Sequence, residues 1–375
     1  MNIFYDENMP LAQAFFNDLG KLTAFSGRDI SAQQLADADV LLVRSITQVN
    51  HTLLKDNQDL KFVGTATIGT DHVDQDYLAS RGVPFHSAPG CNAVSVAEYV
   101  ISALVNLSER YLFNINQKTV GIVGAGNTGT RLSEKLAALG VEHYLCDPLL
   151  EESGKDSRHF VSLEQVLDCD IISLHVPKTL TGEYKTFHLL DEDKLSSLSD
   201  EQILINACRG EVIDNQALLK LKKQGHGLTL VLDVWEGEPN ILMPLLEHVD
   251  IATAHIAGYS LEGKARGTEM LYRALCQKEH IVPEKSLESC LPSPEITSVE
   301  INANYGQNLL SRLVKMVYDI KRDDGIFRQQ INEHGFDYIR KHYPVRREFS
   351  SLIINNPNLC ETGPLDRLGF VVLPR

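Results

Sequence analysis

The sequence predicts an α/β fold built from two Rossmann-like, doubly wound parallel-sheet domains, with an additional α+β domain at the C-terminal end. Short apolar runs alternate with helical segments up to Gly258, as expected of βαβ units and parallel sheets. A glycine-rich turn at 124–129 joins one of these runs to a helix. After Pro283 the alternation ends, so the last part of the chain belongs to a different architecture.

The strand-like runs that precede the glycine turn predict a first unit. We expect strands within 2–6, 39–45, 60–67 and 82–86, and helices over 11–19 and 92–110. In parallel sheets, ligands bind beyond the carboxyl ends of the strands. Polar residues that follow two of these strands are therefore candidate ligand contacts, namely Arg44, Ser45, Thr65 and Thr67.

The glycine turn has the spacing of a dinucleotide-binding motif. Gly124 permits the tight turn, Gly126 lets the backbone approach a pyrophosphate, and Gly129 allows close packing of helix and strand. The helix that begins near Asn127 and Thr128 presents free N–H groups to the phosphates.

A second apolar run, 142–146, ends at Asp147, where an acidic side chain can accept hydrogen bonds from the adenosine ribose. A carboxylate at this position disfavours a 2′-phosphate. The sequence therefore predicts that the cofactor is NAD rather than NADP.

The rest of the predicted second unit continues the same pattern. We expect strands within 170–175, 202–206, 229–233 and 250–254, and helices over 163–167, 191–195 and 215–224. A further helix over 261–276 would return the chain to the first unit. Beyond Pro292 and Pro294, the sequence predicts an amphipathic helix over 308–320 and strands over 349–354 and 368–373. This C-terminal part is either an oligomerisation module or an appendage that folds back on its own chain.

Composition limits the classes of partner. The 375 residues carry a net charge of −15, which argues against binding to nucleic acid or to an anionic membrane. No apolar run reaches membrane-spanning length, and the N-terminus lacks a secretory signal pattern. The cysteines are scattered singly, which indicates neither disulfides nor a metal site, and we expect a reduced, cytoplasmic protein. They are Cys91, Cys146, Cys169, Cys208, Cys276, Cys290 and Cys360.

Three charged residues follow separate strands of the second unit and form a candidate catalytic group, namely Arg209, Glu238 and His255. Histidine side chains exchange protons close to neutral pH, so His255 suits the removal of a hydroxyl proton. A carboxylate can orient the imidazole, and an arginine can bind a substrate carboxylate through two hydrogen bonds. These residue types match NAD-dependent oxidation of a 2-hydroxy acid. We expect His175, at another strand end, to line the cofactor cleft.

These motifs resemble those of the D-isomer-specific 2-hydroxyacid dehydrogenase family, in the same order along the first three quarters of the chain. They are the glycine turn and the segments 174–177, 206–210, 233–239 and 255–258. The resemblance implies NAD contacts at Asp147, Asp233, Gly258, Ala207 and Cys208, and a catalytic trio of Arg209, Glu238 and His255. It also implies a flavodoxin-like substrate domain of residues 1–100 with 259–285, and an NAD-binding domain over 101–258. The remainder, 286–375, would be a dimerisation domain.

Finer features around Glu183 and Tyr259, together with the long C-terminal part, resemble a branch of that family that oxidises a phosphorylated hydroxy acid. This resemblance implies that Ser45, Thr67 and Tyr259 contact the substrate and that the C-terminal part mediates homodimerisation. A phosphate dianion needs cationic partners in a chain of net charge −15. Arg44 is the first candidate. The pair Arg346-Arg347 is a second, unless it is simply solvated.

Two alternatives stay open at the level of sequence. One is a relative that oxidises a shorter phosphorylated acid, such as 3-phosphoglycerate, although the C-terminal part lacks an evident βαββαβ regulatory unit. The other is a non-catalytic, NAD-sensing interaction protein on the same fold, which the intact Arg209, Glu238 and His255 disfavour.

Overall fold

The computed structural model describes residues 1–302, 305–356 and 363–374. Cys360 lies outside the described residues. The chain divides into two compact units. The first comprises Met1–Asn92 with Tyr259–Ser293, and the second comprises Ala93–Gly258 with Pro294–Arg375. Within the described residues, no helix combines the length and hydrophobicity that a bilayer-spanning segment needs.

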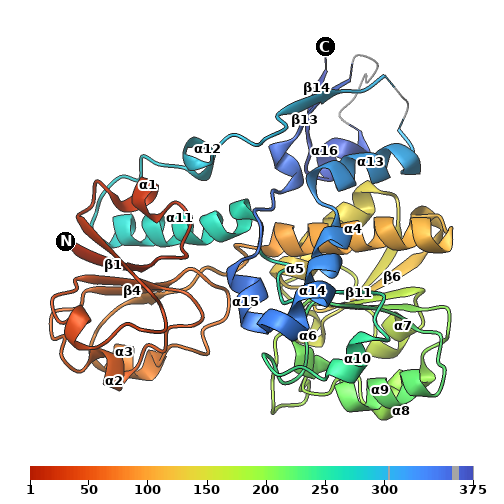
Figure 1. Ribbon diagram of the computed structural model, residues 1–375, viewed down its shortest axis with the longest axis horizontal. Coiled ribbons are helices and arrows are strands. Elements are labelled where there is room, and N and C mark those ends of the chain that lie inside the picture. Colours follow the sequence, from red (N-terminus) through yellow and green to blue (C-terminus); the bar gives the residue numbers. More distant parts are fainter. Residues whose placement is uncertain (303–304, 357–362, 375) are drawn as a thin grey trace. The chain divides into compact units, whose positions relative to one another are not determined.

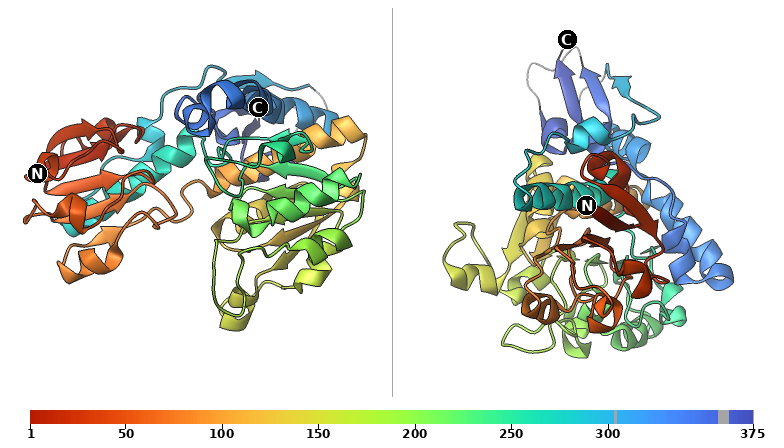
Figure 2. Two further views of the ribbon diagram at one scale, coloured as in Figure 1. Left: turned by 60° about the horizontal axis from the view of Figure 1, so that its bottom comes forward. Right: turned by 90° about the vertical axis from the view of Figure 1, so that its left-hand side faces the viewer.

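The first unit is a parallel sheet with the strand order β2-β1-β3-β4-β5, which is the flavodoxin-like order (Figure 1). Its strands are β1 (Asn2–Asp6), β2 (Lys21–Phe25), β3 (Val40–Val43), β4 (Phe62–Thr65) and β5 (Phe85–His86). Helices α1 (Ala12–Phe16) and α11 (Leu261–Lys278) cover one face, and α2 (His51–Leu54) and α3 (Gln75–Ser80) cover the other (Figure 2). The order reverses between β1 and β3, so a ligand crevice is expected where Arg44 follows β3.

The second unit is built on a parallel sheet with the strand order β11-β10-β9-β8-β6-β7. Its strands are β6 (Thr119–Val123), β7 (Glu142–Cys146), β8 (Ile171–Leu174), β9 (Ile203–Asn206), β10 (Thr229–Leu232) and β11 (Ile251–Ala252). The strand order reverses between β6 and β8. The glycine turn follows β6 and therefore lies at the switch point where nucleotides bind in such sheets.

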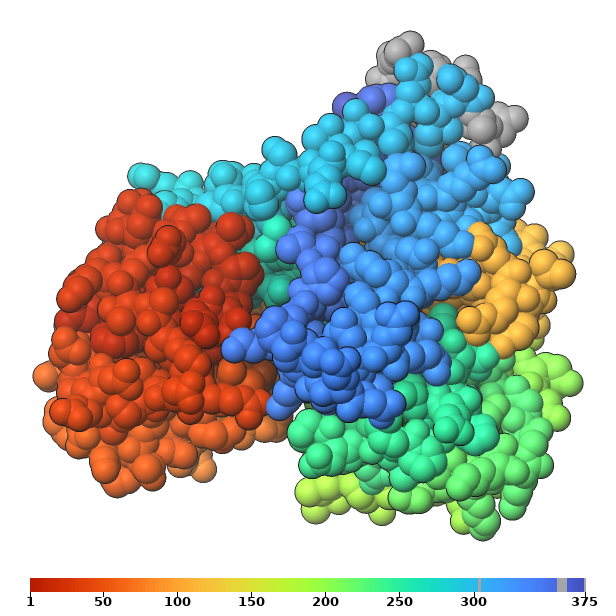
Figure 3. Space-filling view, viewed as in Figure 1, coloured from red at the N-terminus to blue at the C-terminus, as the bar shows by residue number. Residues whose placement is uncertain are grey.

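Helices flank this second sheet on both faces. They are α4 (Ala93–Tyr111), α5 (Asn127–Ala138), α6 (Pro148–Ser153), α7 (Leu163–Leu167), α8 (Glu192–Ser197), α9 (Asn215–Lys223) and α10 (Met243–Leu246). The long helix α4 is buried along most of its length, because both α5 and the C-terminal segment (Pro294–Arg375) pack against it. Figure 3 shows that segment, in blue, spread over the surface of the second unit.

The C-terminal segment adds helices and a small parallel sheet to the second unit. The helices are α13 (Gln307–Val317), α14 (Ile320–His334), α15 (Phe336–Lys341) and α16 (Pro364–Arg367). The short helix α12 (Leu287–Cys290), which precedes them, belongs to the first unit. The sheet has the order β12-β13-β14, with β12 (Ser298–Glu300), β13 (Ile353–Asn356) and β14 (Val371–Pro374). Asp324 of α14 accepts a hydrogen bond from the Ala252 N–H and so covers the edge strand β11.

A buried lysine joins this segment to the nucleotide-binding helix α5. The Lys135 ammonium is 3.1 Å from Glu98 Oε1, donates to the Leu368 carbonyl at 2.5 Å, and lies 5.2 Å from the centre of the Phe349 ring. The Lys135 and Glu98 side chains are 6% and 1% exposed. This ion pair is therefore part of the interior, and the C-terminal segment supplies some of its partners.

The predicted fold class is confirmed, with two parallel doubly wound sheets and a C-terminal α+β part. The boundary of a separate domain at 286–375 stays a prediction. Several predicted elements were wrong in part. The strand expected over 368–373 begins only at Val371, and the helix expected over 11–19 spans Ala12–Phe16. The helix expected over 308–320 ends at Val317, and the strand expected from Phe349 begins with a 3₁₀ turn over Phe349–Ser351.

Candidate active site

The glycine turn has the close approaches that its sequence predicts. Gly124 has φ +92°, and a Cβ there would lie 2.8 Å from the backbone of His175. A Cβ on Gly129 would lie 2.0 Å from the Gly124 carbonyl oxygen. A side chain at Gly129 would separate α5 from the turn, and one at Gly124 would push the turn away from the end of β8, so both glycines are needed for the geometry.

The turn fits the phosphates of a dinucleotide. A Cβ on Gly126 would meet no atom within 4 Å, so this side of the turn is open to a ligand. Helix α5 starts at Asn127 with no side chain capping its N-terminus, which leaves its first N–H groups, including that of Thr128, facing this space. Beside the turn, His175 Nε2 bonds Ser173 Oγ at 2.9 Å, while Nδ1 is buried without a partner among the described residues. Burial lowers the pKa of His175 to about 4, so its ring is neutral at pH 7.

Asp147 lies at the end of β7, where the sequence predicts the ribose contact. Its Oδ2 accepts a hydrogen bond from the Ala125 N–H at 2.9 Å, which fixes the carboxylate beside the glycine turn. Sequence reasoning missed Arg158, which supports the same turn. Its guanidinium donates to the Ala125 carbonyl at 2.8 Å and to Thr130 Oγ1 at 2.9 Å. No motif marks Arg158, because its partners Thr130 and Ala125 lie 28 and 33 positions earlier in the chain.

Two members of the predicted catalytic trio are joined directly. His255 Nδ1 and Glu238 Oε2 are 2.7 Å apart, and Glu238 Oε1 accepts the Trp235 N–H at 2.9 Å. The carboxylate is thereby fixed, and it orients the imidazole so that Nε2 can exchange a proton. His255 has φ +57°, a left-handed conformation that few non-glycine residues adopt. Such a conformation is typical of a residue placed for function.

A buried carboxylate holds the turn that carries His255. Asp233 is 1% exposed and accepts hydrogen bonds from Thr253 Oγ1 and from the N–H groups of Ile256 and Ala257, at 2.6–2.9 Å. Burial raises the pKa of Asp233. Because the carboxylate bonds both sides of His255, it sets the path of the chain there and on to Gly258. The predicted NAD contacts of Asp233 and Gly258 stay predictions.

Arg209 lies in a tight turn after β9. Asn206 organises this turn, since its side chain accepts the Cys208 N–H and donates to the Arg209 carbonyl. Burial raises the pKa of the Cys208 thiol to about 11, so Cys208 is a neutral packing residue beside Ala207. The Arg209 guanidinium donates to the Cys208 carbonyl at 2.7 Å and is half-exposed, which leaves further N–H groups for a substrate carboxylate.

Gly210 allows the arginine turn to pack against the segment that carries Glu238. A Cβ on Gly210 would lie 2.0 Å from the carbonyl carbon of Trp235, a backbone atom that cannot rotate away. The two loops can therefore approach each other only if residue 210 has no side chain.

Replacing Gly210 with alanine is expected to lower kcat by up to about 10²-fold, the loss that a displacement of about 1 Å can cause. Steady-state kinetics checks this. Gly306→Ala is the matched control, because a Cβ there meets nothing within 4 Å. Equal activity of the two variants would contradict the idea that the contact positions Arg209.

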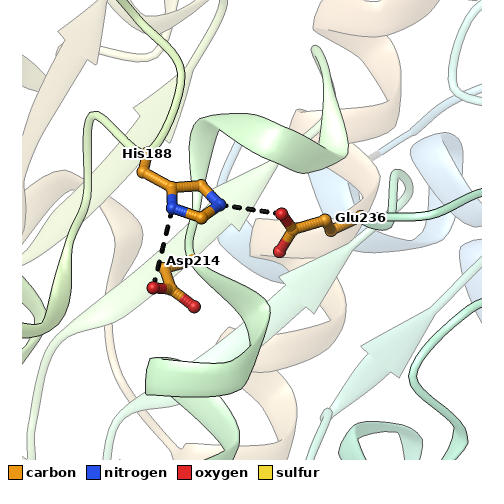
Figure 4. Close-up of side chains that lie close together, drawn as sticks. All are labelled: His188, Asp214 and Glu236. Carbon is orange, nitrogen blue, oxygen red and sulfur yellow. Dashed lines mark hydrogen bonds and ion pairs between the residues drawn. The ribbon is translucent and has the colours of Figure 1, made fainter.

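A second histidine bridges the neighbouring loops (Figure 4). His188 Nε2 lies 2.7 Å from Glu236 Oε1, and Nδ1 lies 3.6 Å from Asp214 Oδ2. The three residues have the composition of a metal site. However, the two ring nitrogens face different carboxylates, so the imidazole links two loops as a clamp rather than sharing one ion with the carboxylates. Glu236 is two residues from Glu238, so this clamp supports the loop that carries Glu238.

In the first unit, the predicted substrate residues lie at the carboxyl ends of β3 and β4. Ser45 is exposed, and Thr67 Oγ1 is bonded to Thr65 Oγ1 at 2.7 Å and to the Gly69 carbonyl. The Arg44 guanidinium lies 5.8 Å from the centre of the Tyr259 ring. Arg44, Ser45, Thr67 and Tyr259 thus share one edge of this sheet, and their contacts with substrate stay predictions.

The suggestion that Arg346 holds the substrate phosphate was wrong. Arg346 is 2% exposed inside the second unit, and its guanidinium donates to the carbonyls of Ala257 and Ser95. It also stacks 3.6 Å from the centre of the Tyr318 ring. A buried guanidinium with these partners is a structural element of the fold, and it has no access to a dissolved anion.

Comparison with known proteins agrees with this geometry. Residues 98–257 match the D-isomer specific 2-hydroxyacid dehydrogenase, NAD binding domain, and residues 290–369 match a domain of unknown function, DUF3410. The crystal structure of D-lactate dehydrogenase from Aquifex aeolicus, complexed with NAD and lactic acid, superposes with a TM-score of 0.59 at 26% identity. It covers 74% of this chain and 96% of the other. The fold and the site therefore define an NAD-dependent oxidoreductase of the 2-hydroxyacid dehydrogenase class.

Relatives with higher sequence identity show which family within this class the chain belongs to. The chain is 58% identical to the erythronate-4-phosphate dehydrogenase of Colwellia psychrerythraea and 53% identical to that of Tolumonas auensis, in each case over 99% of both chains. The chain belongs to the erythronate-4-phosphate dehydrogenase family. This is the branch that the features around Glu183 and Tyr259 indicate, so that prediction and the prediction of NAD are confirmed.

Proposed function

We propose that this enzyme oxidises 4-phospho-D-erythronate with NAD to (R)-3-hydroxy-2-oxo-4-phosphonooxybutanoate, a step of pyridoxine 5′-phosphate biosynthesis. The observation that carries the chemistry is the 2.7 Å contact between His255 and Glu238, in the same unit as a turn that fits a dinucleotide. The name shared by relatives at 53–58% identity supports the choice of acid.

The residues divide the reaction among them. His255 Nε2 accepts the proton of the 2-hydroxyl group, while Glu238 stabilises the imidazolium that forms. The tautomer with the proton on Nδ1 follows from the Glu238 contact. Arg209 binds the substrate carboxylate and polarises the developing carbonyl. When bound, NAD supplies the acceptor for the hydride that leaves the same carbon. Ser45, Thr67 and Tyr259 hold the substrate.

An assay of NAD reduction tests this function. Purified protein is given 4-phospho-D-erythronate or 3-phospho-D-glycerate, with and without an added 2-oxo acid to reoxidise NADH. We expect kcat/KM to be highest for 4-phospho-D-erythronate. A preference for 3-phospho-D-glycerate would establish the alternative substrate. No turnover with any phosphorylated hydroxy acid would instead favour an NAD-sensing protein.

We propose further that the C-terminal segment forms a homodimer. Residues on β14 alternate between the two faces of its sheet. Val371 and Leu373 are 39% and 47% exposed, whereas Val372 is 7% exposed. An apolar sheet face of this kind favours contact with a second copy.

The double substitution Val371→Glu and Leu373→Glu is expected to convert the dimer into monomers, because it would bury like charges at the interface. Light scattering after size-exclusion chromatography measures the mass. Val345→Glu, at a 71% exposed position outside the sheet, is the control. A dimeric double variant would place the interface elsewhere.

A cytoplasmic location is also proposed. The cysteines among the described residues are free, and all but the half-buried Cys290 are buried. Unpaired thiols suit a reducing compartment. Fractionation of cells that express the protein would test the location.

A further inference from the structure

Two cations of the first unit approach the same aromatic ring without an acidic partner. The Lys264 ammonium lies 5.4 Å and the Arg44 guanidinium 5.8 Å from the centre of the Tyr259 ring. Among the described residues, the Arg44 guanidinium donates only a long hydrogen bond, 3.4 Å, to the Asn8 carbonyl, and the Lys264 ammonium has no hydrogen-bond or ion-pair partner. Elsewhere in the same unit, Lys61 pairs with Asp39 and Arg273 pairs with Glu269.

The fold brings these two side chains together at a ligand-binding edge. Arg44 follows β3 at the point where the strand order reverses. Lys264 is on the first turn of α11, one turn before Gly267. A Cβ on Gly267 would lie 2.9 Å from the Ala66 carbonyl, so the start of α11 is packed against the end of β4. This contact holds Lys264 beside the segment that contains Thr67.

An unpaired pair of cations is unfavourable in the absence of a ligand. Lys264 is half-buried, and burial together with the charge of Arg44 lowers its pKa to about 8. The Tyr259 ring compensates only weakly, because the face of an aromatic ring carries only a partial negative charge. A bound anion would remove the repulsion and restore the ordinary pKa of Lys264. A phosphate dianion is the anion that the proposed substrate provides.

We propose that Arg44 and Lys264, together beside Tyr259, form the subsite that binds the phosphate of the substrate, and that Lys264 determines the preference for a phosphorylated acid. This inference rests on the proposed function, because it assigns a role within the same substrate site. Lys264 is a binding residue in this scheme and takes no part in proton or hydride transfer.

Kinetics with two substrates tests the subsite. Lys264→Met is expected to raise KM for 4-phospho-D-erythronate by about tenfold or more, the effect of losing one charge-assisted hydrogen bond. The ratio of kcat/KM for 4-phospho-D-erythronate to kcat/KM for D-erythronate, which lacks the phosphate, should fall by a similar factor, because only the phosphorylated acid uses the subsite. Arg44→Met should act in the same direction. Lys61→Met is the matched control, because it removes the same charge from the same unit. Lys61 lies at the other end of β4 and is already paired with Asp39.

Thermal denaturation gives a readout that is independent of turnover. Without ligand, Lys264→Met should keep or raise Tm, because it relieves repulsion from Arg44, whereas a merely structural lysine would lower Tm when replaced. Inorganic phosphate serves as the probe. It should raise the Tm of the wild type more than that of Lys264→Met, with Lys61→Met behaving as wild type.

The outcomes separate the subsite from the function. If the wild type oxidises 4-phospho-D-erythronate and Lys264→Met keeps its KM, the subsite is wrong and the function stands. If the wild type shows no turnover but phosphate stabilises it and not Lys264→Met, the subsite stands and the proposed function fails. An equal response of wild type and Lys264→Met to phosphate would overturn the subsite on its own.

Discussion

Replacing His255 with asparagine is expected to lower kcat by about 10²–10⁴-fold, the range that a positioned general base contributes. Asparagine cannot take up the proton of the substrate hydroxyl, yet it tolerates the left-handed conformation of residue 255, φ +57°, better than most residues. The loss should therefore reflect chemistry rather than a distorted backbone. Stopped-flow measurement of NADH formation would give the rate of the chemical step.

Binding of NAD provides the internal check for that variant. The glycine turn and Asp147 lie at the ends of β6 and β7, away from the Glu238–His255 contact, so the dissociation constant for NADH should stay close to wild type. His248→Asn, a half-buried histidine of the same unit, serves as the control substitution. Turnover by His255→Asn within a factor of a few of wild type would remove His255 from its role as base.

Replacing Arg209 with lysine is expected to lower kcat/KM by about 10²–10³-fold, comparable to the loss of an electrostatic donor from an active site. Lysine keeps the positive charge but cannot make the paired, planar hydrogen bonds that a guanidinium makes with a carboxylate. It would also lose the Arg209 contact to the Cys208 carbonyl that orients the side chain.

The matched control for Arg209→Lys is Arg273→Lys, the same exchange at a half-exposed surface ion pair with Glu269. That pair contributes little to stability, so the control should behave as wild type. Added guanidinium ion should restore part of the activity of Arg209→Lys. It should leave the activity of Arg273→Lys unchanged. If Arg209→Lys retains full kcat/KM with 4-phospho-D-erythronate, Arg209 does not bind the carboxylate.

Much of the nucleotide site could be predicted because its determinants are local in sequence. The glycine spacing alone predicts the turn. The carboxyl ends of parallel strands lie at one edge of a sheet, so the sequence also places Glu238 and His255 in one site, and the structure shows their contact. The strand β2 was missed because its side chains are mostly polar or half-exposed, as is common for an edge strand, and so it lacks an apolar run.

The errors concern residues whose environment comes from distant segments. Arg346 beside Arg347 has the pattern of a charged surface. It is buried only because carbonyls of Ser95 and Ala257 and the Tyr318 ring surround it. In the sequence, nothing distinguishes Lys264 from any other lysine of an amphipathic helix. Its significance depends on Arg44, which is 220 positions earlier in the chain. No local pattern contains such information.

The contacts of Lys135 have a consequence for the history of this chain. Its ammonium group is on the nucleotide-binding helix, yet it relies on the Leu368 carbonyl and the Phe349 ring as well as on Glu98. A chain that ended before Phe349 would lose the Leu368 carbonyl and the Phe349 ring and would keep only Glu98 of these three groups. Lys135 is therefore matched to the C-terminal segment, and a change in either one calls for a compensating change in the other.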